Sequence, residues 1–187
     1  MNNIEEVRLI LGRHFKQKEV DYIMKGLNQL SFFTLPASTQ FHSATKGGLA
    51  KHSLNVYNKC MDLLPVLGDG INEKDVAICS LFHDLNKTMS GYEHNILKSG
   101  EVSKAKPYTR NPILTGDGST SCYLIRDVLN ISLSPAMYNA IANHNIWEED
   151  WKSNSNIIKK NKYTYRLMLI LVTSDLYCSQ VLEVFKQ

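Results

Sequence analysis

Several histidines and aspartates of this sequence lie on the apolar stripes of predicted helices. His52 follows Leu49 by three positions and precedes Val56 by four, which places the three side chains on one face of a helix. Asp175 follows Val172 by three positions in another apolar segment. Imidazoles and carboxylates bind metals and transfer protons, so inward-facing residues of these types are candidates for chemistry.

Further residues repeat this pattern. His83 follows Cys79 by four positions, and Asp84 comes directly after it. His144 follows Ile141 by three positions in a later apolar segment. An ionised carboxylate in an apolar interior costs several kcal/mol unless something pairs with it. Few lysines or arginines interrupt these stripes, so basic partners are not expected there.

A divalent cation would satisfy the carboxylates and the imidazoles at one point. We therefore predict a divalent metal site; mixed nitrogen and oxygen ligands suit Mn, Fe, Ni, Co or Zn, and Mg is a further candidate. Each residue alone has a simpler explanation, because a single inward histidine is commonly a hydrogen-bonded core residue. Asp175 alone would serve as a hydrogen-bonding link between helices. It is the combination that favours a metal site.

Helical periodicity dominates the rest of the sequence and predicts an all-α fold. Apolar residues mark helices at 4–11 and 20–27, and longer patterns mark helices at 49–65, 76–85, 119–129, 135–144 and 163–184. Between Tyr92 and Tyr108 the period changes. The turn signal Lys98-Ser99-Gly100 predicts a β-hairpin insertion at residues 92–108, with strands at 92–97 and 101–108.

Length and composition limit the possible organisation of the chain. Its 187 residues, 43% of them hydrophobic, fit one domain spanning 1–187 with a core at about 36–180. The net charge of +3 suits an anionic substrate but is too small to favour nucleic acid as the main partner. No leader pattern, membrane-length apolar run or CxxC pair occurs. We expect a cytoplasmic protein with no membrane partner and with reduced, buried cysteines.

The order of these residues and their local sequences resemble the HD-domain phosphohydrolase superfamily, in its small bacterial and phage-type members. Residues 42–56, HSATKGGLAKHSLNV, resemble the segment around the first histidine of such proteins, and residues 81–87, LFHDLNK, resemble their HD-x-G-K element. The similarity covers most of residues 36–180, including the hairpin and the later GDGSTS segment. It implies an HD-type helical bundle whose metal ligands match His52, His83, Asp84 and Asp175.

The resemblance also implies a second metal in some members, bridged by the aspartate that matches Asp84. His144 matches a later family histidine, and Asp117 stands where relatives often carry a histidine, so both are candidate ligands of a second ion. Asp117 also lies where an N-cap of the helix at 119–129 is expected, and capping needs no metal. Both roles stay open. Asn86 replaces the usual glycine after the HD pair without removing a ligand.

The implied activity is metal-dependent hydrolysis of a phosphomonoester or phosphodiester, with a nucleotide or related small phosphorylated compound as substrate. A metal-activated water would attack phosphorus, and Asp84, Lys87 and His144 are the expected catalytic residues. Lys87 would supply a cation to the phosphate, and His144, where it does not bind metal, would protonate the leaving oxygen. His42, Lys46 and Lys87 are expected to bind substrate. The glycines at 47–48 either admit a ligand or form the turn before a helix.

Two other classes of function stay open. One is an HD scaffold that binds a nucleotide or metal without turnover, as a sensor or sequestering protein, and the other is a structural protein whose polar core residues only form hydrogen bonds. No P-loop, GxSxG elbow, HExxH helix or dinucleotide-binding glycine motif occurs. Lys98, Lys104 and Lys106 lie on or near the hairpin and could contact a nucleic-acid strand, although the sequence does not favour this as the main role.

Overall fold

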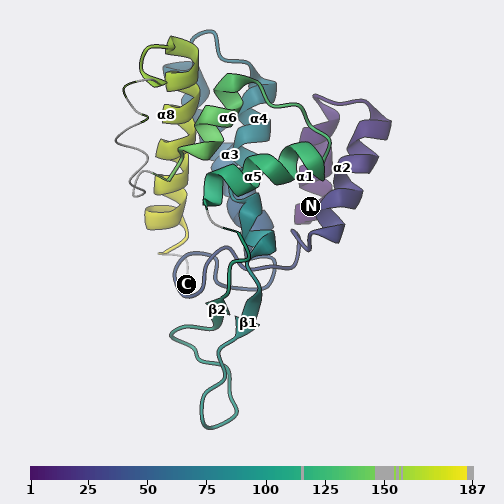
Figure 1. The fold of residues 1–187 in the computed structure, drawn as a ribbon, viewed down its shortest axis with the longest axis vertical. Helices are drawn as coiled ribbons and strands as arrows, with labels where there is room; N and C mark the ends of the chain where they lie inside the picture. The colour runs from purple at the N-terminus through teal and green to yellow at the C-terminus, as the bar shows by residue number, and fades with distance from the viewer. Residues whose placement is uncertain (115, 146–153, 155, 157, 185–187) are drawn as a thin grey trace.

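Helices form most of the molecule, and a small antiparallel sheet projects from one end of them (Figure 1). The computed structural model describes residues 1–114, 116–145, 154, 156 and 158–184. In chain order its elements are α1 (Asn3–Gly12), α2 (Gln17–Gln29), α3 (Gly48–Leu67), α4 (Glu73–Phe82), the 3-10 helix η1 (Leu85–Met89), β1 (Tyr92–His94), β2 (Tyr108–Arg110), α5 (Asp117–Asp127), α6 (Pro135–Ala142), α8 (Lys162–Tyr177) and the π-helical turn η2 (Cys178–Leu182). The prediction of a mostly helical fold with a hairpin is confirmed.

Asparagine and serine side chains define several of the helix starts. Those of Asn2, Asn72, Ser134 and Asn161 each accept a hydrogen bond from a backbone N–H in the first turn of the helix that follows. Pro135 occupies the first turn of α6, where its missing N–H removes no helical hydrogen bond. These caps define helix starts that the apolar patterns alone placed up to three residues later, as at α4, which begins at Glu73 rather than at Val76.

Some predicted helix ends differ from the structure. α3 continues through Pro65 to Leu67, because a proline in the last turn removes only one helical hydrogen bond. α4 ends at Phe82 rather than at Leu85, and the residues from Leu85 onward form η1. The predicted last helix is divided into α8 and η2.

The helical body is arranged around α3 and α8. α3 packs against α4 and α8, while α6 packs against both α8 and α5. Every residue of α4 from Val76 to Phe82 is buried, so this helix contributes to the core on all sides. The packing brings the first turns of α3 to the C-terminal ends of α4, α6 and α8.

Two expectations from composition can be compared with the structure. The four cysteines are free and buried, as predicted, and burial raises the pKa of the Cys60 thiol to about 12. A thiol with that pKa stays protonated at neutral pH and is a poor nucleophile. None of the described helices is long and apolar enough to cross a lipid bilayer.

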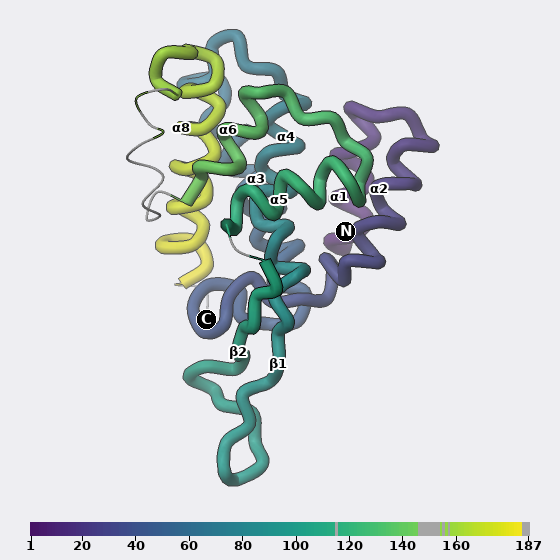
Figure 2. The backbone as a smooth tube through the Cα atoms, in the orientation of Figure 1, coloured from purple at the N-terminus to yellow at the C-terminus, as the bar shows by residue number. Residues whose placement is uncertain are grey.

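The hairpin extends well beyond the helices but contains little regular sheet (Figure 2). β1 and β2 pair antiparallel, with His94 opposite Tyr108 as the outermost pair of the ladder. Toward the tip there is an isolated bridge between Ile96 and Val102. Between these two pairs there is one residue on the side of β1 and there are five on the side of β2, so the ladder cannot continue. The strands are therefore shorter than predicted. Pro107, among those five, has no N–H to donate to a ladder.

Gly118 allows α5 to approach α6 closely. A β-carbon added there would lie 2.4 Å from the carbonyl oxygen of Ile141 and 2.7 Å from the α-carbon of Ala142. Gly118→Ala must therefore displace backbone, and we expect it to lower the free energy of unfolding by about 1–3 kcal/mol. Urea denaturation followed by circular dichroism measures this change.

Gly12→Ala is the matched control, since nothing lies within 4 Å of a β-carbon built at Gly12. We expect its free energy of unfolding to stay unchanged or to rise by up to about 1 kcal/mol. Equal losses in the two variants would show that the contact between α5 and α6 is not the cause.

Candidate metal centre

The two histidines and two aspartates predicted as metal ligands lie together. His52 belongs to the first turns of α3, His83 and Asp84 follow the end of α4, and Asp175 lies near the end of α8. The Nε2 atom of His52 lies 3.1 Å from Oδ1 of Asp175 and 3.6 Å from Oδ2 of Asp84. The Nε2 atom of His83 lies 3.8 Å and 3.5 Å from the same two oxygens. Three helices thus bring four candidate ligand atoms to one point.

These separations suit a metal ion. Ligands about 2.1 Å from a metal lie about 3.0 Å apart at neighbouring octahedral positions and about 3.4 Å apart in a tetrahedron. The observed separations of 3.1–3.8 Å overlap this range and exceed it by at most 0.4 Å. Three groups of buried or half-buried side chains among the described residues could hold an ion. They are His52 with His83 and Asp84, His83 with His144 and Asp175, and His42 with His52 and Glu183.

Each of the three histidines has one ring nitrogen fixed by a hydrogen bond. Nδ1 of His52 donates to Oε1 of Glu183 at 3.0 Å. Nδ1 of His83 lies 2.9 Å from the carbonyl oxygen of Ser80, and Nδ1 of His144 lies 2.7 Å from that of Ile141. Because a carbonyl or carboxylate oxygen accepts the Nδ1 proton, Nε2 is the atom that each ring presents to the cluster. Metal-binding histidines are typically oriented in this way.

Two of these Nε2 atoms have no hydrogen-bond partner among the residues that the structure describes. They belong to His52 and His83, and both are buried. Although Oδ1 of Asp175 lies 3.1 Å from Nε2 of His52, the two groups are not aligned as donor and acceptor. An unpaired buried polar group costs about 1–3 kcal/mol. One divalent cation would satisfy both nitrogens, so the residues present fit a bound metal.

Asp84 has a basic partner that the sequence patterns did not predict. Nζ of Lys87 donates a hydrogen bond to Oδ2 of Asp84. Burial alone would raise the pKa of Asp84, but the Lys87 ammonium together with His83 and His144 outweighs burial and holds this pKa well below its usual range. The expectation of no basic partner was wrong, because η1 turns the chain back after Asp84 and brings Lys87 beside it.

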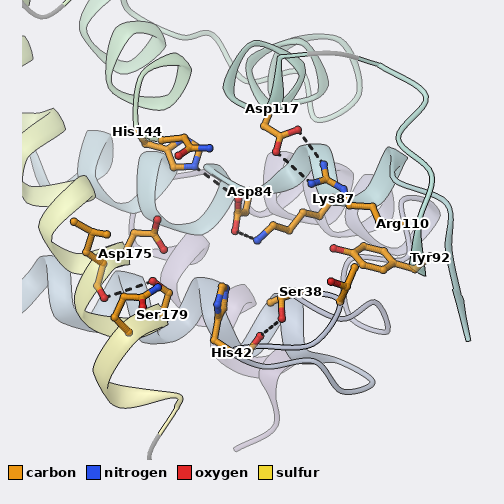
Figure 3. A pocket seen from close by; sticks show the side chains of 15 residues that line it. Ser38, His42, Asp84, Lys87, Tyr92, Arg110, Asp117, His144, Asp175 and Ser179 are labelled. Atoms are coloured by element: carbon orange, nitrogen blue, oxygen red, sulfur yellow. Dashed lines mark hydrogen bonds and ion pairs between the residues drawn. The ribbon is translucent and has the colours of Figure 1, made fainter. Parts of the chain in front are cut away.

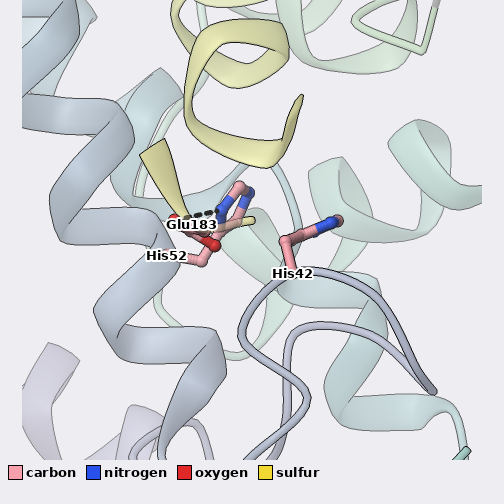
Figure 4. A group of neighbouring side chains, drawn as sticks. All are labelled: His42, His52 and Glu183. Carbon is pink, nitrogen blue, oxygen red and sulfur yellow. Dashed lines mark hydrogen bonds and ion pairs between the residues drawn. The ribbon is translucent and has the colours of Figure 1, made fainter. Parts of the chain in front are cut away.

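Glu183 is a buried residue of the site that the sequence analysis missed. Its Oε1 accepts hydrogen bonds from His52 at 3.0 Å and from Nδ2 of Asn55 at 2.9 Å, and its Oε2 accepts one from Oγ of Ser43 at 2.7 Å. In Figure 4 the link joins Glu183 to His52, while His42 is joined to neither. Burial raises the pKa of Glu183, but these donors outweigh it and lower the pKa to about 2.

A pocket of about 340 Å³ opens beside the cluster (Figure 3). Its lining combines the aspartates and His144 with side chains from the hairpin and from the loop before α3: Ser38, His42, Asp84, Lys87, Tyr92, Arg110, Asp117, His144, Asp175 and Ser179. His42 and Lys87, which were predicted to bind substrate, therefore both line the pocket. The ring of His42 packs 4.9 Å from that of His52, and burial lowers the pKa of His42 to about 4. His42 is consequently neutral at pH 7.

Asp117 belongs to the pocket wall but not to the groups that could hold an ion. Arg110 donates to both of its carboxylate oxygens, at 2.9 and 3.3 Å, and Nε of Arg110 donates to Oγ of Ser90 at 2.7 Å. The N-cap interpretation of Asp117 was wrong, because α5 begins at Asp117 and Gly116 is the N-cap. The sequence analysis did not single out Arg110, since its partner lies on another element.

Lys46, Gly48 and Asn86 were also considered in the sequence, and the structure places each of them. Lys46 is exposed and is not among the residues that line this pocket. A β-carbon at Gly48 would lie 1.9 Å from the carbonyl oxygen of Ser43, so this glycine is needed for the turn before α3. Asn86 is buried and bonds to Ser121 of α5 through its backbone N–H and its side chain. It therefore fixes η1 against α5.

We expect Glu183→Gln to weaken metal binding. Glutamine keeps the size and one oxygen acceptor of Glu183 but removes the charge that orients and polarises His52. Loss of such a partner typically raises the metal dissociation constant about 10–100-fold, which competition with a chromogenic chelator measures. Asp62→Asn is the matched control, because Asp62 is 67% exposed on α3 and pairs with Lys59. An unchanged dissociation constant in Glu183→Gln would contradict this role.

Metal affinity should also depend on pH. Burial lowers the pKa of His52, but the carboxylates of Asp175 and Glu183 outweigh burial and raise it to about 9. His52 is therefore protonated at pH 7 before metal binds, and its Nε2 proton must leave when a metal takes that position. We expect the dissociation constant to fall about tenfold per pH unit from pH 7.0 to 8.5. A constant value over that interval would contradict this prediction.

No family model, curated protein or solved structure matches the chain. The case for a metal centre therefore depends on the chain's own geometry. Buried histidines and aspartates converge at ligand distances, two of their nitrogens lack partners among the described residues, and a pocket adjoins them. These observations support a site that could hold a divalent cation.

Proposed function

We propose that the chain is a metal-dependent phosphoester hydrolase with an HD-type helical domain, acting on a nucleotide or a related phosphorylated compound. The observation that carries the proposal is the pair of Nε2 atoms on His52 and His83. They have no hydrogen-bond partner in the described part of the chain, and they face Asp84 and Asp175 at the edge of an open pocket. The order of these residues along the chain, within the segments that resemble HD proteins, supports the same assignment.

The charges of the pocket support a metal that takes part in substrate binding. The carboxylates of Asp84, Asp117 and Asp175 line it, against the cations Lys87 and Arg110. A phosphate dianion that enters without a metal would lie beside these three carboxylates, which is unfavourable. A divalent cation at Asp84 and Asp175 would offset their charge, so phosphate binding as well as turnover should require metal.

The chemistry that a bound divalent ion supplies is that of a Lewis acid, which lowers the pKa of a water and polarises a phosphoryl oxygen. The chain's own residues position the substrate around it. Lys87 keeps two further N–H groups besides the one that it donates to Asp84, and these can donate to phosphoryl oxygens. Its ammonium would neutralise charge that develops on the phosphate in the transition state.

His144 is suited to the proton transfer that completes hydrolysis. A new bond forms between a water oxygen and phosphorus, the ester P–O bond breaks, and the leaving oxygen needs a proton. Nε2 of His144 lies 3.7 Å from Oδ1 of Asp84, on the pocket side. Burial lowers the pKa of His144, but the carboxylates of Asp84 and Asp175 together outweigh burial and raise it. A raised pKa favours the protonated ring, which is the form that an acid catalyst requires.

Asp84→Ala should abolish metal-dependent hydrolysis of phosphate esters while the helical circular dichroism spectrum is retained. His144→Gln should retain the ion held by His52, His83 and Asp84 and should lower kcat about 10²–10⁴-fold, as expected for loss of a general acid. The measurement is phosphate release from mononucleotides and simple aryl phosphates, after chelation and after return of Mn, Fe, Ni, Co, Zn or Mg. Asp62→Asn serves again as the control.

Two outcomes would count against the hydrolase function. Metal-dependent nucleotide binding without product, for every metal added, would instead indicate a sensor or sequestering module. Bound metal at background level in both the natural chain and Asp84→Ala, with none taken up from added metal, would leave only a binding or a structural role.

A further inference from the structure

One face of the hairpin carries a row of aromatic and basic side chains. Tyr92 lies opposite Arg110, and His94 lies opposite Tyr108. Residues two apart on a strand share a face, and directly paired residues do as well. These four side chains therefore lie on the same face of the hairpin, while Glu93 and its neighbour across the ladder lie on the other.

The aromatic rings of this face follow one another along the hairpin. The rings of Tyr92 and Tyr108 meet edge to face with centroids 6.1 Å apart. The rings of Tyr108 and His94 are stacked, with centroids 4.8 Å apart and planes 28° from parallel. We call Tyr92, Tyr108 and His94 the aromatic strip.

The strip begins inside the catalytic pocket and leads out of it. Tyr92 and Arg110 line the pocket (Figure 3), whereas His94 is exposed and is not among the lining residues. The base of the hairpin is held in place, because the backbone N–H of Tyr108 donates to the carbonyl oxygen of Thr39 at 3.1 Å. Arg110 ties it further to Asp117 of α5. The strip therefore has a fixed direction relative to the proposed metal.

Cations lie on the hairpin beyond the strip. Lys98, Lys104 and Lys106 are all exposed, and the hairpin has two carboxylates, Glu93 and Glu101. Stacking platforms beside basic side chains bind single-stranded nucleic acid, since every base has a face that can stack and every nucleotide carries a phosphate. The modest net charge of the whole chain does not reveal this local excess of cations.

We propose that the hairpin face binds a single-stranded nucleic acid and directs its terminal phosphate into the pocket. The inference rests on the proposed hydrolase function and narrows its substrate from a free nucleotide to a strand end. A pocket of about 340 Å³ is at the small end of ligand sites and suits one nucleotide. The next bases would lie outside the pocket, where Tyr108 and His94 offer surfaces for stacking.

A competing explanation is that the rings only stabilise the hairpin, since aromatic cross-strand pairs do so in many sheets. That explanation predicts no preference for long substrates. The two explanations are separated by comparing the metal-loaded protein's kcat/KM for phosphorylated single-stranded DNA and RNA dodecamers with its kcat/KM for the mononucleotide. We expect the dodecamer to be favoured about tenfold or more at low salt, with the preference falling as salt rises.

His94→Ala should lower the ratio of the two kcat/KM values about tenfold, through loss of one stacking surface. The double variant Lys104→Gln with Lys106→Gln should lower it as well and make it less dependent on salt. Because both lysines are exposed, this variant tests the proposal even where His94→Ala disturbs the hairpin. Tyr22→Ala, which removes an aromatic ring 51% exposed on α2, is the matched control and should leave the ratio unchanged.

Fluorescence anisotropy of a labelled dodecamer separates this inference from the proposed function. Strand binding that His94→Ala weakens, without hydrolysis of any phosphate ester, would support the strand site and reject the hydrolase. Hydrolysis of mononucleotides with no gain for dodecamers, or equal binding of blunt duplex and single strand, would overturn the strand site. A preference for either DNA or RNA would identify which of the two strands is the ligand.

Discussion

The arrangement of this site depends on the cost of removing carboxylates from water. Asp84 and Glu183 are buried and Asp175 is largely so, and each would be strongly destabilising without a counter-charge. The single ring of His52 lies between two of them, with Nδ1 on Glu183 and Nε2 toward Asp175. Lys87 forms an ion pair with the third carboxylate, that of Asp84. The position of the His52 ring is therefore fixed from both sides. The distances between α3, α8 and the end of α4 must be maintained, because otherwise a buried carboxylate would lose its counter-charge.

The ends of two helices fix the other histidines by a common device. The last carbonyl groups of a helix have no helical partner. The Nδ1 proton of His83 is accepted by Ser80 three residues earlier, and that of His144 by Ile141 three residues earlier. In each case a carbonyl group at the end of the helix therefore also orients the histidine ring. Extending α4 to Leu85, as periodicity predicts, would carry the chain after His83 away from the cluster and would remove the turn that brings Lys87 back.

The sequence predicted the inward side chains well, because helical period alone decides which way His52 and Asp175 point. It did not predict partners that depend on how helices meet. Arg110 and Asp117 are seven residues apart on different elements, and no local pattern joins them. Glu183 offered a usable signal, since Asp175, Ser179 and Glu183 follow one another at intervals of four along a single stripe. Lys46 was misplaced because the turn at Gly48, which closes on Ser43, was not visible in the spacing.

The two walls of the pocket are supported separately. On the side of the histidine cluster, Glu183 joins α3 to the loop that carries Ser43 and to the chain after α8. On the hairpin side, Arg110 joins β2 to α5, and Asn86 joins η1 to α5. Few residues are shared between these networks, and Asp84 with Lys87 lies where they meet. Substitutions on the hairpin can therefore change which molecule enters the pocket while the ligand geometry at His52 and His83 stays the same.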